Sequence, residues 1–140
     1  MTLVIDASVA LKWFVDEEGT GQATALLAGS ELLIAPDLIV AEVSNAAWKA
    51  VRTGTMLPEQ QDHAAARLVF AFDELVPLAP LARRAVALSR ALDHPVYDCF
   101  YLALAEARVA KLVTADRRLL VRLAGTQWET LVVDLRSVVG

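Results

Sequence analysis

Short apolar runs alternate along the chain with longer segments that have the periodicity of amphipathic helices. The short runs have the length and apolar character of strands buried on both faces. They cover residues 2–5, 32–35, 74–78, 111–114 and 131–133. The longer segments repeat apolar residues every three or four positions, and they cover residues 8–15, 19–28, 37–52, 58–72, 80–92, 96–109 and 116–123. This alternation predicts an α/β protein with three α/β/α layers around a central parallel sheet of about five strands.

The chain is expected to form a single domain over residues 1–140. A chain of this length suits one domain around one core, and it contains no internal repeat, linker or low-complexity segment. The longest stretch without a charged residue, 19–30, contains polar side chains and is too short for a membrane span. The start, MTLVIDAS, lacks the basic region of a signal peptide. The lone Cys99 excludes an internal disulfide and the usual Cys-based zinc site. We therefore expect a cytoplasmic protein without a membrane segment.

Composition and charge bear on the partners of the protein. Apolar residues make up 56% of the chain, which suggests that some apolar surface is kept for a partner. Trp13 and Phe14 are adjacent and lie about 100° apart on a helix, so at least one is expected near the surface. The net charge of −4 argues against a protein coated in basic charge for nucleic acid, so any such contact should be local. Lys12, Arg117 and Arg118 are candidates for that contact.

Asp98 interrupts the apolar pattern of the helix predicted at 96–109. It lies in line with Leu102 and Ala105, on the face that this helix should bury. An ionised Asp in that position is costly unless hydrogen bonds or a metal ion compensate its charge. A simpler alternative is that Asp98 occupies the first helical turn after Pro95, where an acid favours the helix dipole and needs no function.

Glu42 places a second carboxylate in an apolar stripe. In the helix predicted at 37–52, it lies four residues after Leu38 and four residues before Ala46. A lone Glu on the flank of a helix is usually solvated, but two acids on buried faces are harder to explain as surface residues.

Two further acids follow predicted strands directly. Asp6 comes after the run 2–5, and Asp116 comes two residues after the run 111–114. In an open α/β sheet, ligands bind beyond the carboxyl ends of the strands. The alternative is that both residues only cap the helices that follow, a role that Asp fills well.

Taken together, Asp6, Glu42, Asp98 and Asp116 could share one pocket at the carboxyl edge of the sheet. Clustered carboxylates repel one another, so the cluster is stable as anions only with a cation between them. Oxygen ligands without His or Cys select a hard ion, Mg²⁺ with Mn²⁺ as the expected substitute. Such an ion suits phosphate esters, because it screens the substrate and lowers the pKa of an attacking water. This chemistry explains how an acidic protein could act on RNA.

Four other polar residues are expected to have supporting or structural roles. Ser8 and Thr114 lie close in sequence to the strand-end acids and could orient a carboxylate or a water. His63 and His94 are too far apart in sequence to suggest a metal pair, and both are expected at the surface or at helix caps.

Four segments of the chain resemble the four blocks of PIN-domain ribonucleases, and the similarity is closest to the VapC toxins of type II toxin–antitoxin pairs. These segments are LVIDAS with Asp6, PDLIVAEVSNAAW with Glu42, VYDCFYLALAE with Asp98, and LVTADRRL with Asp116. The order and spacing of the blocks agree over essentially the whole chain, and none of the four acids departs from the family pattern.

The resemblance implies a twisted parallel sheet between helices and a Mg²⁺-dependent endoribonuclease site. Asp6 and Asp98 would then be the principal metal ligands, completed by Glu42 and Asp116 directly or through water. It also implies an RNA substrate, a cognate antitoxin that blocks the site, and a homodimer.

Four alternatives compete with this interpretation. A receiver domain needs two adjacent acids after its first strand and a lysine late in the chain. Here Ile5 precedes Asp6, and Ala115 occupies the stretch after the fourth predicted strand. A haloacid-dehalogenase-like phosphatase needs a second Asp two residues after the nucleophile, where this chain has Ser8. A PIN-fold nuclease with another role, or a non-catalytic module that binds RNA or a protein partner, remains the alternative function.

Overall fold

Five parallel strands form the central sheet of the computed structural model, which describes residues 1–139. The strands are β1 (Thr2–Ile5), β2 (Leu32–Pro36), β3 (Glu74–Val76), β4 (Lys111–Thr114) and β5 (Val132–Asp134). Their order across the sheet is β3-β2-β1-β4-β5, and every neighbouring pair is parallel. The predicted fold class and the predicted number of strands are confirmed. The third strand ends before Pro77, because proline has no backbone N–H to donate to a neighbouring strand.

The strand order reverses between β1 and β4. The chain first builds outward from β1 through β2 to β3, and later returns to the other side of β1 to add β4 and β5. Leu3 pairs with Lys111 and Ile5 with Val113, so the two central strands end at nearly the same level. Ligands in open α/β sheets bind at the carboxyl edge where this reversal occurs. The acids that follow β1 and β4 are therefore adjacent in space, although more than a hundred residues separate them in sequence.

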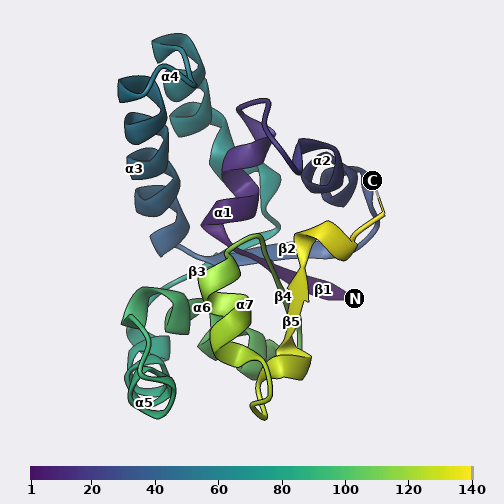
Figure 1. Cartoon of the computed structure of the whole chain (residues 1–140), viewed down its shortest axis with the longest axis vertical. Helices are drawn as coiled ribbons and strands as arrows, with labels where there is room; N and C mark the ends of the chain where they lie inside the picture. Colours follow the sequence, from purple (N-terminus) through teal and green to yellow (C-terminus); the bar gives the residue numbers. More distant parts are fainter. Residues whose placement is uncertain (140) are drawn as a thin grey trace.

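Seven α-helices surround the sheet within residues 1–139, in two groups above and below it in Figure 1. They are α1 (Ala7–Ala10), α2 (Thr20–Ala28), α3 (Leu38–Arg52), α4 (Pro58–Arg67), α5 (Ala82–Leu92), α6 (Val96–Arg108) and α7 (Arg117–Leu123). The first four helices lie above the sheet and the last three below it (Figure 1). Two predicted helices are shorter than expected, because the segments 11–13 and 68–71 continue as 3-10 turns.

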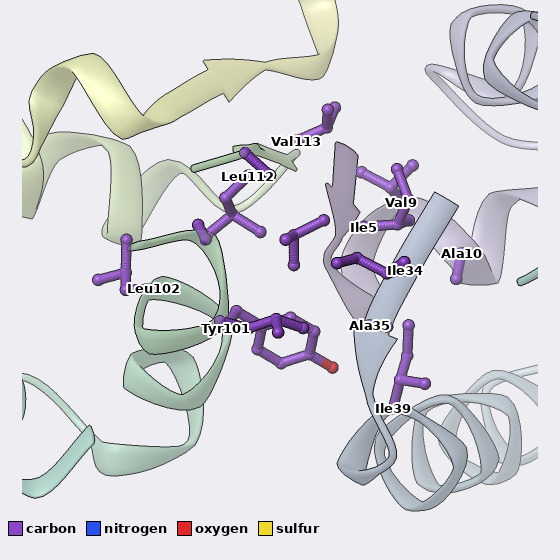
Figure 2. Packing of buried hydrophobic residues seen from close by; sticks show 14 of the residues in the cluster. Ile5, Val9, Ala10, Ile34, Ala35, Ile39, Tyr101, Leu102, Leu112 and Val113 are labelled. Carbon is purple, nitrogen blue, oxygen red and sulfur yellow. The ribbon is translucent and has the colours of Figure 1, made fainter. Parts of the chain in front are cut away.

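The core is centred on α6, which lies against β1, β2 and β4. Residues 101–105 of α6 are all buried, because the helix contacts the sheet on one side and α5 on the other. The ring of Tyr101 extends from α6 toward the strands (Figure 2), and Leu102 belongs to the same buried cluster as Ile5 and Leu112. A smaller cluster of Val15, Ala47, Met56 and Ala64 joins α3 to α4. These contacts fix the start of α6 beneath the carboxyl ends of the central strands.

Trp13 and Phe14, which follow the first helix, lie at the edge of the core and keep part of their surface exposed. Trp13 and Phe14 are both half-buried and pack against the core. The Trp13 indole N–H donates to the carbonyl of Ala23 at 2.8 Å, and the Phe14 ring meets His63 edge-on at 5.9 Å between centroids. The helix α1 ends at Ala10, before both aromatic residues, and α2 and α4 contact the two rings through Ala23 and His63. Within residues 1–139, the aromatic side chains that are exposed lie elsewhere: Trp48 at 46%, Phe70 at 72% and Tyr97 at 58%.

Among residues 1–139, each helix is too short or too polar to span a lipid bilayer.

Candidate active site

The structure brings the four predicted acids to one cavity of about 280 Å³ at the carboxyl edge of the sheet. Asp6 arrives at the end of β1, Asp116 after β4, Glu42 from α3 and Asp98 from the first turn of α6. Ser8, Asn45 and Lys49 also line this acid cavity. Asn45 and Lys49, which lie one turn and two turns after Glu42 on α3, were not among the predicted site residues.

Asp6 is the most buried of the four acids, with 5% of its surface exposed. Its Oδ2 accepts hydrogen bonds from the Ser8 hydroxyl at 2.5 Å and the Thr114 hydroxyl at 3.0 Å. The two hydroxyls in turn accept from the backbone N–H groups of Ala115 and Asp116, both at 3.0 Å. Ser8 and Thr114 therefore connect the end of β1 to the end of β4 through the Asp6 carboxylate. Both hydroxyls thus contact the Asp6 carboxylate, and their role in orienting it for chemistry stays a prediction.

Burial has the largest effect on the pKa of Asp6. The pKa of Asp6 is raised from 3.8 to about 6, chiefly because the carboxylate loses hydration. The nearby charge of Asp98 also raises this pKa, while the hydrogen bonds from Ser8 and Thr114 lower it. The carboxylate is therefore held in a site where ionisation is costly without a compensating positive charge.

Glu42 accepts a hydrogen bond from Tyr101, which was not among the predicted site residues. The Tyr101 hydroxyl donates to Glu42 Oε1 at 2.7 Å, and the Tyr101 side chain is completely buried. Figure 2 shows the ring of Tyr101 extending from α6 with its hydroxyl directed toward α3. Burial raises the pKa of Glu42, and the charges of Asp6 and Asp98 raise it further, against the lowering effect of this hydrogen bond. A buried tyrosine hydroxyl needs a partner, and this requirement is the signal that could have identified Tyr101.

Asp98 is paired with His94, which corrects the prediction that His94 is only a surface or cap residue. His94 Nε2 lies 2.6 Å from Asp98 Oδ2, and only 10% of the histidine side chain is exposed. The chain turns back before α6 because Asp93 adopts a left-handed conformation with φ of 49° and Pro95 follows. Burial raises the pKa of Asp98, and the contact with His94 opposes that shift. The other histidine, His63, is exposed, as expected.

The two strand-end acids also cap helices. Asp116 Oδ1 accepts from the backbone N–H groups of Arg118 at 2.9 Å and Leu119 at 3.4 Å at the start of α7. Asp6 caps α1 through the backbone N–H of Ser8 at 3.3 Å. The capping role and the position at the cavity are therefore compatible, because each Asp has two carboxylate oxygens.

The donor set fits a divalent cation in chemical type. Four carboxylates around one cavity supply the oxygen ligands that Mg²⁺ and Mn²⁺ prefer. Within residues 1–139, no three His, Cys, Asp or Glu side chains stand close enough together to hold an ion. All four acids instead accept hydrogen bonds from protein groups. The four acids thus have the ligand chemistry that Mg²⁺ or Mn²⁺ needs, and they line one cavity. Their carboxylates accept hydrogen bonds from protein groups.

Comparison with known proteins identifies relatives over most of the chain. Residues 3–125 match the PIN domain family. Ribonuclease VapC3 from Pyrobaculum aerophilum is 35% identical over 121 residues, which cover 85% of this chain and 92% of that protein. The crystal structure of PAE2754 from the same organism has a TM-score of 0.71 at 22% identity, over 98% of this chain and 85% of that chain. A toxin–antitoxin complex from Klebsiella pneumoniae has a TM-score of 0.69 at 21% identity, over 95% of this chain and 97% of that chain.

Replacing Asp6 by Asn should stabilise the metal-free protein in a pH-dependent way. Because the folded-state pKa is raised, ionisation of Asp6 opposes folding; the cost is complete above about pH 6 and disappears below 3.8. At pH 7.5 in EDTA, Asp6→Asn should raise the free energy of unfolding by up to about 3 kcal/mol, and most of this gain should be lost at pH 4. Urea unfolding at both pH values measures the effect. The exposed Asp62→Asn is the matched control, and a gain that is the same at both pH values would contradict the assignment.

Replacing Tyr101 by Phe should separate the hydrogen bond to Glu42 from the packing of the ring. The free energy of unfolding should fall by about 1–2 kcal/mol, because the carboxylate loses its buried donor while the ring still fills the core. A double-mutant cycle with Glu42→Gln isolates the pairwise contribution. Tyr97→Phe, at an exposed position on the same helix, is the control. Equal effects of the two tyrosine substitutions would show that the hydrogen bond contributes nothing.

Proposed function

The chain belongs to the PIN-domain family, and from this membership we propose that it is a Mg²⁺-dependent endoribonuclease that acts as the toxin of a toxin–antitoxin pair. The observation that supports the proposal best is the convergence of Asp6, Glu42, Asp98 and Asp116 on one cavity from four separate segments. Burial raises the pKa of three of these acids. Such an arrangement costs stability and is typical of functional sites. We take residues 1–140 to be one nuclease domain.

The residues of the chain would prepare the site for hydrolysis of a phosphodiester. Asp6 and Asp98 would be the principal ligands of Mg²⁺ or Mn²⁺, with Glu42 and Asp116 completing the set directly or through water. When bound, the ion would screen the charge of the substrate and lower the pKa of the attacking water.

The groups around the acids would keep them in position. Ser8 and Thr114 orient Asp6 by donating to its Oδ2, and Tyr101 limits the rotation of Glu42. His94 holds Asp98 at the start of α6. Residues of this kind tune a ligand without contacting the substrate, and their loss usually weakens metal affinity or activity.

The proposed partners are a cognate antitoxin and a second copy of the chain. The similarity to a ribonuclease named VapC3 and to a toxin–antitoxin complex from Klebsiella pneumoniae supports a toxin role, which is a proposal for this chain. A small open reading frame next to the gene would be the expected source of the antitoxin. Co-expression of that frame should suppress cleavage by the toxin, whereas a PIN-fold nuclease with another role would lack such an inhibitor.

Asp98→Asn should reduce Mg²⁺-dependent cleavage of RNA to the rate of a buffer control. The amide preserves the shape of the side chain but removes one negative charge from the proposed metal site. Gel analysis of a labelled RNA pool measures cleavage, and circular dichroism verifies the fold. Asp62→Asn, an exposed position on α4, should cleave like the wild type. Cleavage at the wild-type rate by Asp98→Asn, or by the wild type in excess EDTA, would refute the metal-dependent mechanism.

Mg²⁺ and Mn²⁺ should raise the melting temperature of the wild-type protein. A ligand that binds only the folded state adds RT ln(1 + [L]/Kd), about 2.7 kcal/mol at a hundredfold excess over Kd. The cation also relieves repulsion among the acids, so Asp6→Asn should show a smaller shift. Thermal unfolding with increasing metal concentration tests this, with Asp62→Asn as control. A wild-type melting temperature that is indifferent to both ions would show that the acids do not bind them.

A further inference from the structure

A second and larger hollow, of about 680 Å³, lies beside the acid cavity along α7. We call it the arginine groove, because Arg117, Arg118 and Arg122 of α7 line it. The opposite wall consists of the turn between α5 and α6, which includes His94. All three arginines are exposed.

Two residue pairs connect the arginine groove to the acid cavity. His94 lines the groove, and its Nε2 lies 2.6 Å from Asp98 Oδ2. Arg118 also lines the groove, and its backbone N–H donates at 2.9 Å to the carboxylate of Asp116, which lines the acid cavity. The two hollows therefore meet along a common wall.

Two of the three groove arginines form no ion pair with the residues that the structure describes. Arg122 pairs with Asp93, whose Oδ2 lies 3.4 Å from Arg122 Nη2. The guanidinium groups of Arg117 and Arg118 have neither an ion pair nor a hydrogen bond with any residue between 1 and 139. The positive charge of Arg118 does act on the nearby acid cavity, because it lowers the pKa of Asp98. In a chain of net charge −4, this is a local concentration of available positive charge.

Lys12, the third basic residue that the sequence suggested for a contact with nucleic acid, is paired within the protein. Its Nζ donates to the backbone carbonyl of Glu18 at 2.6 Å and to the Glu17 carboxylate at 3.2 Å. Only 14% of the Lys12 side chain is exposed. Lys12 therefore organises the loop before α2, and the available charge is on α7.

We propose that the arginine groove binds the backbone phosphates of RNA that neighbour the scissile phosphate, with Arg117 and Arg118 as the contacts. The proposal rests on the ribonuclease function proposed above. An RNA strand carries one charge per nucleotide, so a strand that crosses the acid cavity must place other phosphates beside it. Planar guanidinium groups bind phosphate oxygens in a bidentate manner. The groove would thus compensate the repulsion between RNA and the four acids.

The test compares two double variants that lose the same charge. Arg117→Ala with Arg118→Ala removes the available groove charge, and Arg83→Ala with Arg90→Ala removes two exposed arginines of α5 that do not line the groove. Binding of a labelled single-stranded oligoribonucleotide is measured by fluorescence anisotropy in EDTA, over a series of NaCl concentrations. Cleavage of the same RNA is then measured in Mg²⁺. Circular dichroism and thermal unfolding verify that both variants are folded.

The groove variant should bind RNA roughly fivefold more weakly per lost phosphate contact near 0.1 M salt, and the slope of log K against log salt should fall by about 0.7 per contact. Its KM for cleavage should rise more than its kcat falls, and the α5 variant should match the wild type. Replacing both groove arginines by Lys should recover part of the affinity.

Two results would overturn the proposal, and they are distinguishable. If the wild type cleaves RNA while the groove and α5 variants bind and cleave alike, the groove is not the path of the RNA. If the wild type neither binds nor cleaves RNA, the ribonuclease function fails and the groove assignment fails with it.

Discussion

The buried Asp6 carboxylate is the constraint on which the candidate site depends. Of the polar and charged residues between 1 and 139, only Asp6 and Thr114 are buried. Their hydrogen bond, supported by Ser8, ties together the ends of two strands that are far apart in sequence. A neutral side chain at Asp6 would be easier to bury. An ionised carboxylate that is costly to bury and is oriented by two hydroxyls at the edge of the sheet is therefore best explained by a role in catalysis. The apolar core around it offsets its unfavourable free energy.

The fold places two further acids, Asp116 and Asp98, at the same cavity as Asp6. The reversal of strand order places Asp116 next to Asp6, and α6 begins beneath them with Asp98 in its first turn. α6 can carry an acid there because its middle, residues 101–105, is completely buried and anchors it against the sheet. Tyr101 combines both roles, since its ring packs in the core and its hydroxyl reaches Glu42.

The surface near the site has an acidic part and a basic part. The acid cavity concentrates carboxylates, and burial raises the pKa of Asp6, Glu42 and Asp98 among them. The neighbouring arginine groove concentrates guanidinium groups. His94 and Arg118 each belong to the groove and each contact an acid of the cavity. An acidic protein can thus present a local basic surface to a polyanion, which its net charge alone would not suggest.

The fold class could be predicted from the sequence, and the same patterns selected the four acids that line one cavity. Apolar runs that alternate with helical periodicity are a local property of the chain, and so is an acid such as Asp98 that interrupts an apolar stripe. Which groups contact those acids depends instead on how the helices and strands pack. Tyr101 and Glu42 come from different helices, and His94 reaches Asp98 only because the chain turns back at Asp93. Trp13 and Phe14 likewise contact Ala23 and His63 of other helices, which periodicity cannot reveal because it describes one element at a time.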